Sequence, residues 1–200
     1  DRIIALPETI GEEGVLLALA ATAYHVTQGK KALQPDLIVG HGVLGRLIAR
    51  IAVMLGGHPV VWEINSDRMG KADGYTVVHP SEDQESKYKN ICDASGQVDV
   101  LNSLVGQLLP GGEITLAGFY NKDIQFNFPQ AFMKEARFRI AAQWAPQDLA
   151  DVKQMISSGH LNLRGLITHH RTPSSIGEAY HTAFEDPNCL KMIVDWREAS

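Results

Sequence analysis

Three glycines at the spacing G-x-G-x-x-G could hold a diphosphate against the backbone. Gly40, Gly42 and Gly45 follow the short apolar run 36–39. Because glycine has no side chain, Gly40 permits a tight turn, Gly42 lets a pyrophosphate approach the backbone, and Gly45 lets helix and strand pack closely. Unpaired N–H groups at the start of the following helix would attract the anion. The residues between the glycines are candidate cofactor contacts as well: His41, Val43 and Leu44.

His41 could touch a phosphate or have no part in binding. An acid, Glu63, ends the second apolar run at 59–63, where dinucleotide-binding domains hold a ribose. A carboxylate there accepts hydrogen bonds from a vicinal diol and repels a 2′-phosphate, so NAD is expected rather than NADP. Glu63 could instead be a solvated strand end, and Arg68 could stack on adenine or bind a 2′-phosphate.

These residues need elements that bring them to one edge of a sheet. Apolar residues recur with the helical period from Leu44 to Leu55, and Gly56 ends the pattern. Further strands are expected at 75–79, 88–93, 113–118 and 138–144, with a helix at 98–109. Alternating strands and helices predict an α/β fold, a doubly wound Rossmann sheet of about six parallel strands. Strand ends then supply more candidate contacts: Ser95, Gly118 and Phe119.

The segments flanking this sheet have a different character. A capping box at 9–12 should open an Ala/Leu-rich helix that runs to about Gly29. This helix is apolar on most sides and should be buried between two layers or two domains. The stretch 124–128 alternates like a strand, and a helix is expected at 146–158. A strand (166–170), a helix (174–184) and a strand (189–196) close the chain. The expected divisions are a connecting helix (1–34), a Rossmann domain (35–145) and a C-terminal part (146–200).

Composition excludes some classes of protein. A net charge of -5 argues against nucleic acid as the main partner. No apolar run reaches the roughly 18 residues of a membrane span, and residues 1–7 lack the regions of a signal peptide. Cys92 and Cys189 form no C-x-x-C pair, so buried thiols and a cytoplasmic location are expected.

The chain resembles the medium-chain dehydrogenases/reductases over nearly its whole length. The resemblance is carried by 22–25 (Thr-Ala-Tyr-His), the glycine loop, 61–65, 93–96 and 111–114. It implies hydride transfer to NAD, and a C-terminal segment returning to a GroES-like half that would mostly precede residue 1. It also implies a homodimer joined through the sheet edges, for which 138–144 is the candidate strand. A fragment of this kind should bind NAD weakly and turn over nothing.

Longer strings, at 21–25, 39–46, 60–63, 116–120 and 189–192, are similar to a narrower group within that family. Its members oxidise the 3-(1-hydroxyethyl) group of a bacteriochlorophyllide to 3-acetyl in bacteriochlorophyll biosynthesis. This resemblance implies a tetrapyrrole substrate, which Phe119 and Tyr120 could face, although aromatic residues there are more often packing.

Family position also implies roles for the first helix. Thr22 would lie near the nicotinamide. Zinc-dependent members have a metal ligand four residues earlier, where this chain has Ala18, so no zinc is expected. Without zinc, Tyr24 or His25 could take the hydroxyl proton, although either could simply be a helix residue satisfied by the core.

Three other functions fit parts of the pattern. S-adenosylmethionine-dependent methyltransferases also place a glycine turn after the first strand and an acid after the second. A non-catalytic NAD-binding module would share the loop and Glu63. A relative acting on a small alcohol or a quinone would share the family but differ in substrate.

Overall fold

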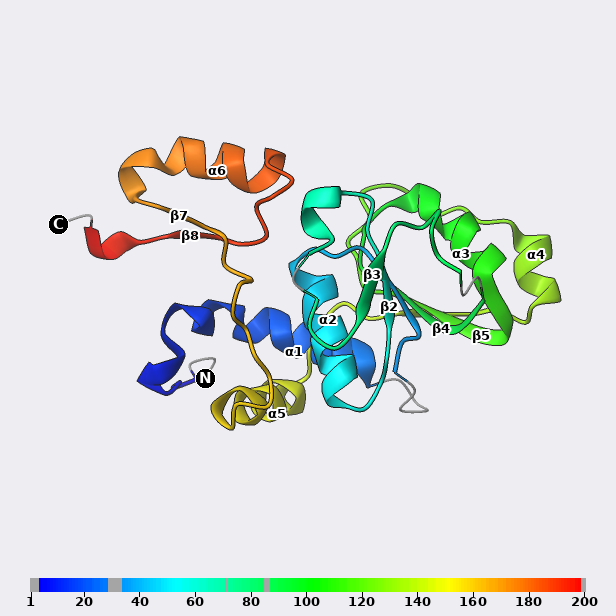
Figure 1. Cartoon of the computed structure of the whole chain (residues 1–200), viewed down its shortest axis with the longest axis horizontal. Helices are drawn as coiled ribbons and strands as arrows, with labels where there is room; N and C mark the ends of the chain where they lie inside the picture. Colours follow the sequence, from blue (N-terminus) through cyan, green and yellow to red (C-terminus); the bar gives the residue numbers. More distant parts are fainter. Residues whose placement is uncertain (1–3, 29–33, 71, 85–86, 199–200) are drawn as a thin grey trace.

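The computed structural model describes residues 4–28, 34–70, 72–84 and 87–198 (Figure 1). A six-stranded sheet lies at its centre, with the strand order β3-β2-β1-β4-β5-β6, and every neighbouring pair is parallel. This confirms the predicted doubly wound α/β fold. The strands are β1 (Leu37–Val39), β2 (Val60–Trp62), β3 (Thr76–Val78), β4 (Tyr88–Asp93), β5 (Leu108–Leu116) and β6 (Arg137–Ile140).

Helices cover both faces of this sheet, because alternate side chains of a strand point to opposite sides. Ile38 of β1 packs in one apolar cluster, with buried residues of α1 (Leu17–Thr27), α2 (Val43–Met54) and α5 (Pro146–Ser157). Leu37 and Val39 pack in a second cluster, with α3 (Leu101–Gln107) and α4 (Phe128–Met133). Strands buried on both faces are typical of parallel sheets.

The first helix lies between two others, as its apolar composition predicted. α1 packs against α2 and α5 (Figure 1), and Ala20, Ala21 and Ala23 are fully buried. Small side chains let the helices approach closely. The predicted start was wrong, however, because the segment Glu8–Leu16 (η1) is a 3-10 helix. Gly11 interrupts it with a φ of +56°.

Some strand predictions differ from the structure as well. Residues 124–128 form no strand; instead the Asn127 side chain accepts a hydrogen bond from the Gln130 N–H and caps α4, and Pro129 lies in its first turn. A cap followed by proline favours a helix start over a strand. The last strand of the sheet, predicted at 138–144, is Arg137–Ile140 and ends earlier.

The C-terminal part has its own small sheet. Strands β7 (His169–Arg171) and β8 (Met192–Val194) pair in parallel, and α6 (Ile176–Glu185) connects them. The predicted strand–helix–strand order is therefore confirmed, with shorter strands. Short 3-10 helices complete the fold: η2 (Ser66–Arg68), η3 (Val98–Val100), η4 (Pro173–Ser175) and η5 (Trp196–Glu198).

Both cysteines are buried free thiols, as predicted. No helix in the described part of the chain has the length and apolar character needed to cross a bilayer.

Candidate dinucleotide site

A cavity of about 540 Å³ opens at the carboxyl ends of β1, β2 and β4. The chain leaves β1 toward β2 on one side, while β4 lies on the other side of β1. Doubly wound sheets bind their ligands at such a switch point. Five of the predicted cofactor contacts line the cavity: Gly40, Gly42, Glu63, Arg68 and Ser95.

The glycine loop has the geometry that its spacing predicted. Gly40 has a φ of +94°, which side chains rarely tolerate. A Cβ on Gly45 would lie 1.9 Å from the Gly40 carbonyl oxygen, so only glycine allows this approach of helix to strand. At Gly42 a Cβ would meet no atom within 4 Å. Gly42 therefore leaves open space in front of the loop.

The start of α2 offers donors to that space. Gly42 is the N-cap residue, and it has no side chain to accept a hydrogen bond from the first turn. The first N–H groups of a helix have no partner within the helix and carry a partial positive charge. Val43 and Leu44 supply two of these groups, while their side chains pack against the core. The arrangement suits an anion.

Glu63 is built into this loop and is not a solvated strand end. Glu63 is only 7% exposed. Oε2 accepts a hydrogen bond from the His41 N–H at 2.9 Å, and Oε1 accepts from the N–H groups of Ile64 and Asn65 at 2.8 and 2.9 Å. A carboxylate has about four acceptor positions. Oε2, with one protein donor, can therefore accept a ribose hydroxyl as well.

His41 lies behind the loop and does not face the cavity. Its ring is fully buried, with Nδ1 2.6 Å from the Arg68 carbonyl oxygen and Nε2 2.8 Å from the Tyr75 hydroxyl. Burial lowers the pKa of His41 to about 4. Because its N–H donates to Glu63, neither ring nor amide reaches toward a phosphate here. Of the two alternatives for His41, this arrangement favours the one in which it has no part in phosphate binding.

The end of β4 holds a buried acid that the sequence did not reveal. Asp93 is fully buried, and its Oδ1 accepts hydrogen bonds from the N–H (2.8 Å) and hydroxyl (2.6 Å) of Ser95. Its Oδ2 accepts from the Tyr120 hydroxyl at 2.6 Å. Burial and this acceptor raise the pKa of Tyr120. Asp93 therefore fixes Ser95 at the cavity wall, and Tyr120 is occupied with packing.

Gly118 and Phe119, the predicted cofactor contacts after β5, lie outside the cavity lining. A Cβ on Gly118 would lie 2.5 Å from the Gly96 nitrogen, so this glycine allows the loops after β4 and β5 to touch. Phe119 is 90% exposed. The contacts of both residues with a cofactor stay a prediction.

The candidates on α1 lie away from the cavity lining. The Thr22 hydroxyl donates to the Ala18 carbonyl oxygen at 3.1 Å. His25 Nδ1 lies 2.8 Å from Asp148 Oδ2, which also accepts from the Ala145 N–H at the start of α5. Burial, and then the carboxylates of α5, raise the pKa of Tyr24. The catalytic roles of Tyr24 and His25 stay predictions.

No family model matches the chain. Two relatives called 2-desacetyl-2-hydroxyethyl bacteriochlorophyllide A dehydrogenase are each 53% identical to it. That of Cereibacter sphaeroides matches over 98% of this chain, and that of Rhodobacter capsulatus over all of it. The chain spans 62% and 64% of their lengths. A sorbitol dehydrogenase of Halalkalibacterium halodurans is 24% identical over 87% of this chain.

Solved structures share the fold. A protein named short chain alcohol dehydrogenase, from Escherichia coli CFT073 and complexed with NADH, superposes on 96% of this chain with a TM-score of 0.83 at 19% identity. The 2R,3R-butanediol dehydrogenase of Bacillus subtilis also covers 96%, with a TM-score of 0.82 at 18% identity. This chain covers 62% and 60% of those structures. The sequence relatives support the medium-chain dehydrogenase/reductase family for this chain, and the solved structures show that it shares the fold of alcohol dehydrogenases.

Proposed function

We propose that this chain is the cofactor-binding portion of an NAD-dependent alcohol dehydrogenase of bacteriochlorophyll biosynthesis. The enzyme would oxidise the 3-(1-hydroxyethyl) group of a bacteriochlorophyllide to a 3-acetyl group. The observation that carries the proposal is 53% identity, over the whole chain, to two proteins named for this substrate. The cavity at the switch point of the sheet supports it, because its backbone donors and its acid suit a dinucleotide.

The residues of this chain would bind and orient NAD. The open side of Gly42 and the first turn of α2 suit the diphosphate. Glu63 suits the adenosine ribose and would disfavour the 2′-phosphate of NADP. Arg68 lines the same cavity and would lie against the adenine. Bound NAD would accept the hydride from the alcohol carbon, while the protein supplies orientation.

The hydroxyl proton needs an acceptor when the hydride leaves. His25 is the better candidate of the two on α1, because imidazole is the commonest general base and Asp148 orients this ring. Tyr24 has a raised pKa, which makes it a poorer base near neutral pH. Thr22, one turn earlier on the same helix, would lie near the nicotinamide. Ala18 in the ligand position supports an enzyme without zinc.

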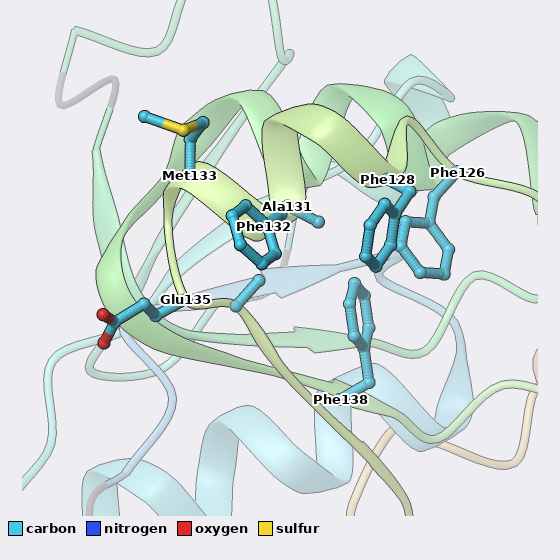
Figure 2. Close-up of a pocket in the computed structure, with 8 residues that line it drawn as sticks. Phe126, Phe128, Ala131, Phe132, Met133, Glu135 and Phe138 are labelled. Atoms are coloured by element: carbon cyan, nitrogen blue, oxygen red, sulfur yellow. The ribbon is translucent and has the colours of Figure 1, made fainter.

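Further parts of the proposal concern assembly. The C-terminal segment, with its separate β7–β8 sheet, would return to a GroES-like half. Two copies would join along β6, the edge strand, to make a homodimer. Phe138 and Ile140 of β6 are 37% and 77% exposed. Phe138 also lines an apolar pocket, together with Phe126, Phe128, Phe132 and Met133 (Figure 2). We place the enzyme in the cytoplasm.

Two measurements test this proposal. The longer protein containing this chain should reduce NAD when given 3-(1-hydroxyethyl) bacteriochlorophyllide, with an acetyl product visible in the absorption spectrum. Butanediol and sorbitol serve as control substrates. The 200-residue chain alone should bind NADH more tightly than NADPH and should show no S-adenosylmethionine binding in a thermal-shift assay. Turnover of a small alcohol but not of the tetrapyrrole would refute the substrate, and preference for NADPH would refute the role of Glu63.

A further inference from the structure

Two buried side chains connect the glycine loop to the segment after β2. His41 is fully buried and Arg46, in α2, is only 3% exposed. Nδ1 of His41 lies 2.6 Å from the carbonyl oxygen of Arg68. Nη2 of Arg46 donates to that same oxygen at 2.8 Å, and its Nη1 donates to the carbonyl oxygen of Gly70 at 3.3 Å. We call these two side chains and two carbonyl groups the buried clamp.

The clamp has a defined proton arrangement. A carbonyl oxygen can only accept, so Nδ1 of His41 carries the hydrogen and Nε2 accepts from the Tyr75 hydroxyl at 2.8 Å. Arg46 Nε also donates to the carbonyl oxygen of His41 at 3.0 Å, which ties helix, loop and segment together. The clamp therefore joins three parts of the chain that only the fold brings together.

A contribution to the stability of the fold does not by itself explain why Arg46 is buried in the clamp. In the described part of the chain no carboxylate forms an ion pair with Arg46, and its guanidinium is held by neutral carbonyl oxygens. Burying a cation in this way carries a desolvation cost that an apolar side chain of similar volume would avoid. Burial accordingly lowers the pKa of Arg46. What the clamp supplies in return is a fixed position for the backbone at residues 68–70.

That backbone carries the groups that face the adenosine half of the cavity. Arg68 and Asn65 both line the cavity, and the Arg68 N–H donates to the Asn65 carbonyl oxygen within η2. Glu63 also lines the cavity, and its Oε2 accepts a hydrogen bond from the N–H of His41 itself. One residue of the loop therefore sets the relative positions of the acid and the arginine.

We propose that His41 and Arg46 are positioning residues that hold Glu63 and Arg68 in register for the adenosine half of a dinucleotide, and so set the preference for NAD over NADP. This inference rests on the proposed function, because it assumes that a dinucleotide occupies the cavity. Neither residue touches the cofactor; each acts through the backbone that it holds.

Calorimetric titration of the 200-residue chain with NADH, NADPH and ADP-ribose tests the inference. His41→Leu removes both ring hydrogen bonds while keeping an apolar volume. We expect it to weaken the binding of NADH and of ADP-ribose by the same factor, about tenfold. The ratio of NADH affinity to NADPH affinity should also decrease. His41→Asn keeps a donor near the position of Nδ1 and should restore most of the affinity. Arg46→Lys, which cannot reach all three carbonyl oxygens, should resemble His41→Leu.

Tyr75→Phe is the matched control, because it removes the hydrogen bond on the far side of the same ring. It should lower the thermal midpoint while leaving each dissociation constant within about twofold. If His41→Leu and Arg46→Lys bind both dinucleotides like the wild type, the clamp has no role in binding and the inference fails alone. If Tyr75→Phe weakens binding as much as His41→Leu does, the effect is general destabilisation, and the inference also fails. A wild-type chain that binds no dinucleotide refutes the proposed function itself, and the inference with it.

Discussion

Replacing Glu63 by glutamine changes one atom of a buried group that accepts three backbone N–H bonds. If the amide oxygen of glutamine takes the two N–H groups of Ile64 and Asn65, its NH₂ group faces the N–H of His41, donor against donor. The reversed orientation leaves two donors without an acceptor. Glu63→Gln therefore always leaves at least one buried N–H group unsatisfied.

The structure gives the size of this effect. An unsatisfied buried donor costs about 1–3 kcal/mol in the free energy of unfolding. For a chain of this length, 1 kcal/mol lowers the thermal midpoint by about 2–4 °C, so a loss of several degrees is expected. NADH affinity should fall as well, while NADPH affinity should fall less or rise, because the negative charge beside the ribose is gone.

Thermal unfolding and calorimetric titration measure the two effects separately. Glu82→Gln is the control, since it removes the same charge at an exposed position, and it should change neither quantity. Suppose that the Glu63→Gln variant unfolds like the wild type and keeps the same ratio of NADH to NADPH affinity. Glu63 would then neither stabilise the loop nor bind the ribose.

Three further predictions concern the same edge of the sheet. Gly42→Ala should leave the thermal midpoint unchanged but abolish dinucleotide binding, whereas Gly45→Ala should prevent folding, since its methyl group would overlap the Gly40 oxygen; equal midpoints for the two variants would refute this reading. The pKa of His41 is lowered from 6.5 to about 4 in the folded protein, so the unfolded chain takes up a proton at higher pH than the folded one does. The stability that neutral His41 contributes is therefore present above about pH 6.5 and is lost as the pH falls toward 4. Urea unfolding across this pH range should show that loss, and the free energy of unfolding should change less steeply with pH in His41→Gln. Tyr120→Phe removes a donor to a buried carboxylate and should cost about 1–3 kcal/mol in urea unfolding; no loss would mean that water replaces the hydroxyl.

The glycine loop could be predicted because its chemistry is local. Gly40, Gly42 and Gly45 act through the backbone of a single turn, and their spacing alone fixes what each must allow. The sheet followed from strands alternating with helices. The stretch 124–128 misled the prediction, because a cap by Asn127 and a following proline outweighed a polar–apolar alternation.

The network behind the loop could not be predicted for a physical reason. Arg46 is satisfied by backbone carbonyl oxygens, and every residue has one of those, so no side-chain pattern marks the partner. The hydrogen bond from Tyr120 to Asp93 joins the loop after β5 to the end of β4, and these are adjacent only once the sheet has formed. A histidine in a glycine loop suggests a phosphate, but its surroundings turn the ring inward.

The strand order has a consequence for how this chain is made. β1 lies in the middle of the sheet and pairs with β2 on one side and β4 on the other. A ribosome therefore releases β1 well before its second neighbour exists, and one apolar edge stays open during that interval. Pairings between distant segments form slowly, and open edges in partly folded chains invite aggregation. Yield from expression should accordingly depend on translation rate, growth temperature and chaperone supply.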